Sequence, residues 1–272
     1  MNAQEKNFIT TVQQFYAKHG RHTLPWRKTH NPYRILVSEI MLQQTQVERV
    51  IPKYQNFLTL FPTVEALAAA SLGEVLVAWQ GLGYNRRAKM LHACAQVVVT
   101  DLGGKWPRTH AGLVALPGVG PYTASAVLAF AFNVPTPLIE TNVRTVYIHH
   151  FFPNETEVPD RALLPIIERT LNTEHPRTWY AALMDYGSYL KATVGNKSRA
   201  SKHHVKQSKF EGSDRQIRGA IIRILGTGRF ATIQIIEAKM ATFEPERIAG
   251  QITALVQEGM IVKIKNKYAL PQ

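Results

Sequence analysis

Apolar residues recur every three to four positions through about the first 190 residues, which is the period of an amphipathic helix. The longest such run is 33–61, where Pro52 is expected to kink or divide the helix. Shorter helices, separated by Gly and Pro, are predicted at 63–70, 72–80, 85–101, 110–115, 121–132 and 141–151. No window alternates between apolar and polar residues as a strand would. We therefore predict an all-α domain over residues 1–190.

The segment 191–213 has a different character. Its first 19 residues carry six Lys or Arg, two His and no acidic residue, and few of them are apolar. This composition predicts a mobile basic linker, which is either a solvated tether or a segment that follows a phosphate backbone. Because the charge is all of one sign, we favour the second interpretation, with Lys197, Arg199 and Lys202 as candidate DNA-binding residues.

Residues 214–272 form a second pattern, with helical spacing at 214–226, 231–240 and 245–260. Alternation over 261–271 then predicts a short hairpin that turns near Asn266. Three helices followed by a hairpin resemble a winged helix, an α+β unit. The third helix is acidic and only the hairpin is rich in Lys, so we expect a wing-type DNA contact or a protein-docking module.

Composition narrows the class of partner. The 272 residues carry a net charge of +13 at pH 7, which favours a polyanion such as nucleic acid. Cys94 is the only cysteine, which excludes an intramolecular disulfide, a Cys-ligated zinc site and a four-cysteine iron–sulfur cluster. It lies in an apolar helical run and is expected to be buried and inert. With no signal peptide and no long apolar run, we expect a cytoplasmic, nucleoid-associated protein without a membrane partner.

The stretch 116-LPGVGPYTASAV-127 contains the most specific short motif. Gly118 and Gly120 allow a tight turn around Val119, and a helix follows at once, so backbone amides near Thr123 converge on a spot suited to a phosphate. No metal ligand set is expected, although the hairpin could also hold a monovalent cation. An ordinary tight turn between helices is the alternative.

Glu39 is surrounded in the sequence by Ile, Leu, Val and Met from Ile35 to Leu42. A carboxylate in apolar surroundings is costly unless paired, and its pKa tends to rise, which suits a general acid. Gln43 and Gln46 follow at helical spacing and would present amides on the same face. The alternative is a buried structural Glu paired with an Arg.

Two of these motifs resemble one family. The pattern LPGVG-xx-TA-xx-V is similar to the helix-hairpin-helix element of DNA glycosylases of the endonuclease III type. The string SEIMLQQTQV resembles the signature of MutY-type adenine DNA glycosylases, which excise adenine opposite 8-oxoguanine or guanine. The similarity continues through WR at 26–27, FPTVEALA, GLGYNRRAK and GGKWP, and thins to YAALMDYG at 180–187. It implies a two-lobed helix-hairpin-helix glycosylase fold followed by the winged-helix-like domain.

The resemblance also implies roles for residues of the first lobe. Glu39 would protonate adenine N7, and Gln43 with Gln44 would probe the opposite and flipped nucleotides. Tyr84, at the tip of a Gly-rich loop, would be the wedge that fills the gap left by the flipped base. Arg86 and Arg87 would contact phosphates, or else form the solvated face of the next helix.

Beyond the hairpin motif, at the entry to the next helix, Glu140 lies where this family has its catalytic Asp, and Asn142 lies at the family's Asn. A carboxylate beside C1′ would stabilise an oxocarbenium-like sugar cation. Glu has one methylene more than Asp, which moves the carboxylate charge by about 1.5 Å. Because Glu is a poor N-cap, we expect Thr141 or Asn142 to cap the next helix. Without the family resemblance, Glu140 could equally be a solvated charge at a helix start.

Tyr122 stands where bifunctional relatives have a Schiff-base Lys. The resemblance therefore implies that Tyr122 lines the catalytic pocket and that no lyase step occurs.

We therefore expect a monomeric, monofunctional glycosylase of base excision repair that acts on adenine mispaired with 8-oxoguanine or guanine in double-stranded DNA. Two alternatives stay open. One is a thymine or uracil glycosylase for mismatches with G, since Tyr122 suits both groups. The other is a weak or inactive protein that binds mismatched or bent DNA, which the Glu at position 140 favours. The resemblance implies no cofactor here, because the four-cysteine cluster of many relatives cannot form.

Overall fold

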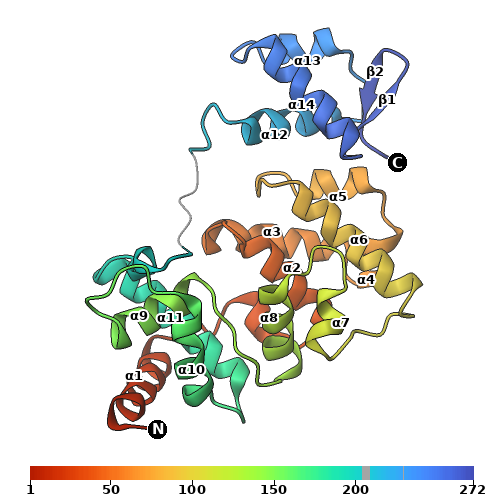
Figure 1. Ribbon diagram of the computed structural model, residues 1–272. Coiled ribbons are helices and arrows are strands. Elements are labelled where there is room, and N and C mark those ends of the chain that lie inside the picture. The colour runs from red at the N-terminus through yellow and green to blue at the C-terminus, as the bar shows by residue number, and fades with distance from the viewer. Residues whose placement is uncertain (204–208, 229) are drawn as a thin grey trace. The chain divides into compact units, whose positions relative to one another are not determined.

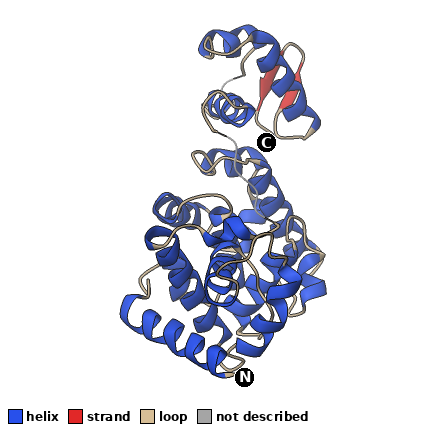
Figure 2. Cartoon of the chain, turned by 60° about the vertical axis from the view of Figure 1, so that its left-hand side comes forward, coloured by secondary structure: helices blue, strands red, loops and turns tan. Residues whose placement is uncertain are grey.

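The computed structural model describes residues 1–203, 209–228 and 230–272. Within these residues the chain is helical apart from one short hairpin near the C-terminus (Figure 2). The chain divides into two compact units, which are described separately below. The first unit comprises Met1–Leu36, Pro107–Ala115 and Val119–Lys206, and the second comprises Val37–Trp106, Leu116–Gly118 and Gln207–Gln272. The prediction of an all-α fold with a small α+β C-terminal part is confirmed.

The first unit is built around α11, which packs against α1, α8 and α9 (Figure 1). Its helices are α1 (Ala3–His19), η1 (Pro25–Lys28), α7 (His110–Val114), α8 (Pro121–Phe132), α9 (Thr141–Phe151), α10 (Asp160–Thr170), α11 (Pro176–Thr193) and η2 (Lys197–Ala200). Phe8, Tyr147 and Trp179 meet edge to face or tilted in its core and are at most 2% exposed. Aromatic packing of this kind anchors α9 against α1 and α11.

The second unit contains the end of α2 (Pro32–Leu42) and the helices α3 (Val47–Leu60), α4 (Val64–Ala69), α5 (Leu72–Ala78) and α6 (Arg86–Thr100) (Figure 1). Helices α4 and α5 pack on α6, and α3 packs on α5. Ser71 caps α5 with a capping box to Glu74, as the sequence pattern Ser-x-x-Glu allows. Phe57, Trp79 and Leu91 are fully buried in this unit.

The C-terminal module belongs to the second unit. It consists of α12 (Asp214–Leu225), α13 (Ile233–Lys239), α14 (Pro245–Gln257) and the antiparallel strands β1 (Val262–Ile264) and β2 (Lys267–Ala269). Lys265, at the turn of the hairpin, takes a φ of 55°. Gly73 of α5 donates its backbone N–H to the Pro271 carbonyl at 3.0 Å, so the C-terminal strand region is tied to α5. The predicted order of three helices and a hairpin turning near Asn266 is confirmed.

Two of the predicted helices, 121–132 and 141–151, have the observed bounds. The long run 33–61 does divide, but not at Pro52, which lies inside α3. The break falls between Leu42 and Val47, where Gln44 takes a left-handed φ of 54°. A residue with a left-handed φ turns the backbone out of a right-handed helix, so the helical run cannot continue through it.

The predicted linker is more ordered at its start than its composition suggests. Helix α11 continues to Thr193, and η2 follows at Lys197–Ala200 and packs on α9. Ser198 and Ser201 are buried, and Ser201 pairs with Val158 in an isolated parallel bridge. Tertiary contacts thus order residues up to Ser201 in spite of their polarity. Residues 204–208 of the predicted linker lie outside the described residues.

Candidate active site and DNA interface

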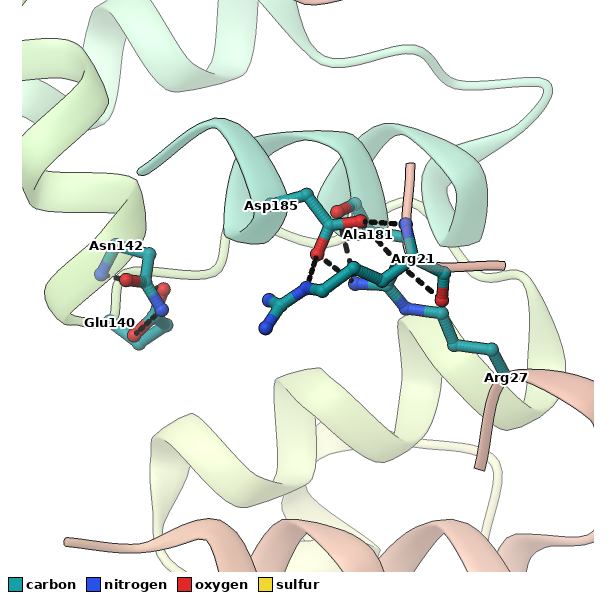
Figure 3. Close-up of polar contacts among 6 residues, drawn as sticks. All are labelled: Arg21, Arg27, Glu140, Asn142, Ala181 and Asp185. Carbon is teal, nitrogen blue, oxygen red and sulfur yellow. Dashed lines mark hydrogen bonds and ion pairs between the residues drawn. The ribbon is translucent and has the colours of Figure 1, made fainter. Parts of the chain in front are cut away.

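Glu140 is the N-cap of α9. Its Oε1 accepts hydrogen bonds from the backbone N–H groups of Asn142 at 2.7 Å and Val143 at 3.0 Å. Its Oε2 accepts from the Asn142 side-chain amide at 3.3 Å, which draws the two side chains together (Figure 3). The extended backbone of Glu140, with φ −132° and ψ 179°, lets the side chain fold back over the first turn. The expectation that Thr141 or Asn142 caps this helix is therefore wrong, because the longer Glu side chain reaches the amides itself.

The Glu140 carboxylate lies at the positive end of the α9 dipole and near two cationic side chains. Arg144, one turn further along α9, forms a bidentate ion pair with Asp160 at 2.7 and 2.8 Å. That hydrogen-bonded pair, with help from the charge of Glu140, raises the pKa of Arg144. Burial lowers the pKa of Lys191, and the nearby Glu140 charge partly opposes this. The half-buried carboxylate is thus held in one place by donors and positive charge.

The sequence interpretation did not single out two residues of α11, of which Gly187 lies against Asn142 and Asp185 holds two arginines. A Cβ at Gly187 would lie 2.5 Å from the Asn142 carbonyl oxygen, so only glycine lets α9 approach α11 this closely. Two residues earlier, the buried Asp185 accepts hydrogen bonds from Arg21 and Arg27, whose side chains converge on it (Figure 3). An Asp inside an apolar helix was the available signal, because a buried carboxylate requires such partners.

The hairpin motif forms a tight turn that leads into α8. Gly118 has a φ of 74°, and a Cβ there would lie 2.6 Å from the Met90 Cβ. Gly120 is the N-cap of α8 and offers no side chain to the first turn. Val119 and Thr123 are buried, whereas Gly118 and Gly120 are exposed. Exposed glycines before a helix N-terminus leave backbone that a phosphate can approach closely.

Tyr122 lies in the first turn of α8 and is partly buried against the core of the first unit. Its ring therefore belongs to the same unit as Glu140 and Asn142. That residue offers a phenol in place of an amine, as the sequence predicted.

Glu39 is 6% exposed on α2, among the buried Leu36, Ile40 and Met41. The expected common face of Gln43 and Gln46 is not present, because α2 ends at Leu42. Gln43 and Gln44 instead form the turn after the helix, and Gln46 is the N-cap of α3. A turn presents the two neighbouring glutamines together, which a helix would not do.

Arg87 differs from its expected role. Its guanidinium donates to the backbone carbonyls of Ile40 and Gln43, each at 2.6 Å, and also to those of Met41, Leu82 and Gly83. Burial lowers the pKa of Arg87 to about 10. These bonds join the end of α2 to the loop before α6, so Arg87 organises the turn instead of reaching out to a phosphate. Arg86 is exposed, and a phosphate contact for this residue stays a prediction.

Tyr84 lies at the tip of the predicted wedge loop and has a φ of 49°. Gly81 and Gly83, which precede it, also have positive φ. The Arg87 guanidinium lies 5.4 Å from the centre of its ring. Arg215 of α12 lies 4.9 Å from the same ring centre and donates to the Tyr84 hydroxyl at 2.6 Å. The predicted wedge thus contacts the C-terminal module, which the sequence did not indicate.

The three predicted cations of the basic segment lie in the first unit. Lys197 and Arg199 belong to η2, and Arg199 and Lys202 are exposed. Because η2 packs on α9, these charges are carried by an ordered turn next to the helix that Glu140 caps. Their contact with DNA stays a prediction.

Several side chains show no sign of chemistry. Cys94 is buried, and desolvation raises the pKa of its thiol to about 12. His150 packs against Phe8 and contacts the Tyr186 hydroxyl at 3.0 Å, and burial lowers its pKa to about 4. Among the described residues, no three His, Cys, Asp or Glu side chains gather where they could hold a metal ion. No described helix is both long and apolar enough to cross a membrane.

Comparison with known proteins supports the family. The model of the HhH-GPD superfamily base excision DNA repair proteins matches residues 37–165. An adenine DNA glycosylase of Buchnera aphidicola subsp. Baizongia pistaciae is 36% identical over 67% of this chain, and the match spans about half, 52%, of that relative. An adenine DNA glycosylase of Mycolicibacterium smegmatis is 34% identical over 89% of each chain.

Among solved structures, one described as a thermostable thymine-DNA glycosylase has a TM-score of 0.63 and 29% identity. That similarity covers 71% of this chain and 90% of the other. The helical fold, the hairpin before α8, the carboxylate that caps α9 and these matches agree. The chain belongs to the HhH-GPD superfamily of base excision DNA repair proteins, in the branch that contains the adenine DNA glycosylases.

Proposed function

We propose that this protein is a monofunctional DNA glycosylase that removes adenine mispaired with guanine or 8-oxoguanine. The observation that carries the proposal is the Glu140 carboxylate, which two backbone amides and the Asn142 side chain hold at the start of α9. A fixed negative charge is what a developing sugar cation requires, and it costs no reorganisation during the reaction. The names of the relatives at 34–36% identity support adenine as the base.

In the proposed reaction, the target adenosine leaves the base stack. The buried Glu39 carboxyl gives its proton to adenine N7 while the bond between N9 and C1′ breaks and its electron pair goes to the base. Apolar surroundings favour the protonated form of a carboxyl, which suits a proton donor. Glu140 stabilises the cation at C1′, and water adds there and releases a proton. Tyr122 provides no amine, so the abasic strand stays uncut.

The test is a panel of duplexes containing A:8-oxoguanine, A:G, T:G and U:G, followed by alkaline cleavage at abasic sites. We expect product from the first two duplexes alone, and strand cleavage only after alkali. Product from T:G or U:G alone would support the second candidate, which the 29% identity to a thymine-DNA glycosylase favours. If no duplex yields an abasic site, the proposed activity is wrong.

Glu140→Gln separates charge from capping. A Gln side chain keeps an oxygen that can accept from the Asn142 and Val143 amides, so stability should fall by less than about 1 kcal/mol. Losing the charge should lower the single-turnover excision rate by about 100- to 1000-fold. Glu168→Gln, at an exposed position of α10 in the same unit, is the matched control and should leave the rate unchanged. Equal rates for wild type and Glu140→Gln would contradict the mechanism.

A further inference from the structure

The second unit contains a cavity of about 500 Å³ beside the predicted wedge. Part of its wall comes from the turn after α2 and the start of α6, and part comes from α12 and the residue after α14. The polar side chains that line it include Gln43, Gln44, Tyr84, Arg215, Arg218 and Glu258. The last three lie outside residues 37–165, so the family match assigns them no role. A volume of this size suits a small planar ligand.

Arg215 is held in place over the predicted wedge. Its Nη1 donates to the Tyr84 hydroxyl at 2.6 Å, its Nη2 donates to the Lys209 carbonyl at 3.3 Å, and its guanidinium lies 4.9 Å from the Tyr84 ring centre. A planar guanidinium on an aromatic face occupies the position that a stacked nucleobase would take. The pair therefore combines a stacking surface with a hydrogen-bond donor beside it.

A second pair of side chains adds a hydrogen-bond acceptor to the cavity. Arg218 and Glu258 form a bidentate ion pair at 2.9 and 2.6 Å, and their side chains are 19% and 35% exposed. The Lys89 ammonium donates to the Glu258 backbone carbonyl, so the end of α14 is joined to α6. The cavity thus presents guanidinium donors and a carboxylate acceptor on an anchored frame.

These groups match guanine better than the other bases. Guanine has two neighbouring acceptors, O6 and N7, to which an Arg fork can donate both of its N–H groups. Its N1–H and N2 amino groups are donors, which suit a carboxylate. Adenine offers an acceptor and a donor on the edge where guanine offers two acceptors, and pyrimidines present a single polar group there.

We propose that Arg215 is a specificity-determining residue for guanine opposite the excised adenine, and that in this cavity it donates to the O6 and N7 acceptors of that base. In 8-oxoguanine N7 carries a hydrogen, so that base can accept from Arg215 only through O6. The base stacks on the Tyr84 ring and takes the place of the guanidinium, which moves to the edge of the base. This inference rests on the proposed function. The C-terminal module would then contribute to substrate choice through Arg215 of α12. This role does not require α14 to read the DNA sequence.

The experiment measures single-turnover excision of adenine opposite guanine, 7-deazaguanine, which lacks N7, and cytosine. Wild type should prefer guanine over both others by on the order of tenfold. Arg215→Ala should lose that preference, because the rate opposite guanine falls toward the rate opposite the other two bases. Arg215→Lys keeps the charge without the fork, and it should lose the preference as well. A uniform fall opposite all three bases would mean a phosphate contact and would overturn the proposal.

Arg223→Ala is the matched control, because Arg223 is an exposed arginine on the same helix and does not line this cavity. It should keep the preference for guanine. Thermal unfolding of each variant identifies any loss of folding. A binding measurement separates the two proposals. Fluorescence anisotropy gives the affinity for the same duplexes when the target nucleotide is an adenosine analogue that resists excision. A binding preference that Arg215→Ala removes would support the cavity even where no excision occurs, and an unchanged preference would overturn it.

Discussion

Replacing Asp185 with Asn should destabilise the first unit strongly. The carboxylate is 2% exposed and accepts from the Arg21 backbone N–H at 2.8 Å and Nε at 2.7 Å. It also accepts from Arg27 Nη1 at 2.5 Å and Nη2 at 2.8 Å. An Asn amide removes the charge and turns an NH₂ group toward these donors. Breaking a buried ion pair at one partner costs about 3–5 kcal/mol, and we expect the free energy of unfolding to fall by that amount.

Urea denaturation at pH 7, followed by circular dichroism, measures this change. Asp214→Asn is the control, because Asp214 makes an ion pair with Arg247 at a similar distance, 2.6 Å, but is 57% exposed. An exposed pair contributes at most about 1 kcal/mol, so this variant should unfold almost as the wild type does. If the two variants lose equal stability, burial is not what makes the Asp185 network strong, and the reasoning fails.

The pH dependence provides a second measurement of the same network. Desolvation alone would raise the pKa of Asp185, but the hydrogen bonds and charges of Arg27 and Arg21 outweigh it and lower the pKa below the ordinary value of 3.8. A carboxyl with a lowered pKa stabilises the fold fully above its unfolded pKa and loses that contribution as the pH falls through its folded pKa. The gap between wild type and Asp185→Asn should therefore be constant above about pH 5 and shrink below pH 3.8. A gap that widens in acid would contradict this assignment.

Two further predictions concern the hairpin and the thiol. Gly118→Ala combines a φ of 74° with a Cβ 2.6 Å from Met90, and it should lose about 1–3 kcal/mol of stability together with DNA affinity in an anisotropy titration. Gly120→Ala has no atom within 4 Å of the added Cβ and should change stability much less, so equal losses would refute the steric argument. The Cys94 thiol, buried and with its pKa raised to about 12, should resist a thiol reagent at pH 8 and react once denatured. Rapid labelling of the folded protein would show that the helix around Cys94 opens.

Local pattern accounts for most of the helices. Pro121 at the first position of α8 and the apolar run behind it specify both ends of that helix, because a helix start depends on residues within one turn. The alternation after α14 likewise predicted the hairpin with its turn at Asn266. The failures arise where a side chain acts over a distance. Arg87 was expected to be an exposed cation, yet its half-buried guanidinium donates to carbonyls more than 40 residues away in sequence.

The candidate site divides in the same way. The identity and order of Glu39, Tyr84, Glu140 and Asn142 could be predicted from short motifs, because their spacing along the chain is a property of the sequence. The cap that Glu140 forms on α9 is a local contact with residues 142 and 143, and it was missed because Glu is seldom an N-cap residue. Only the tertiary structure brings Arg215 to Tyr84 across 131 positions. Helix formation depends on neighbours three and four residues apart, whereas such contacts depend on how separate helices pack, and no local period of the sequence records that packing.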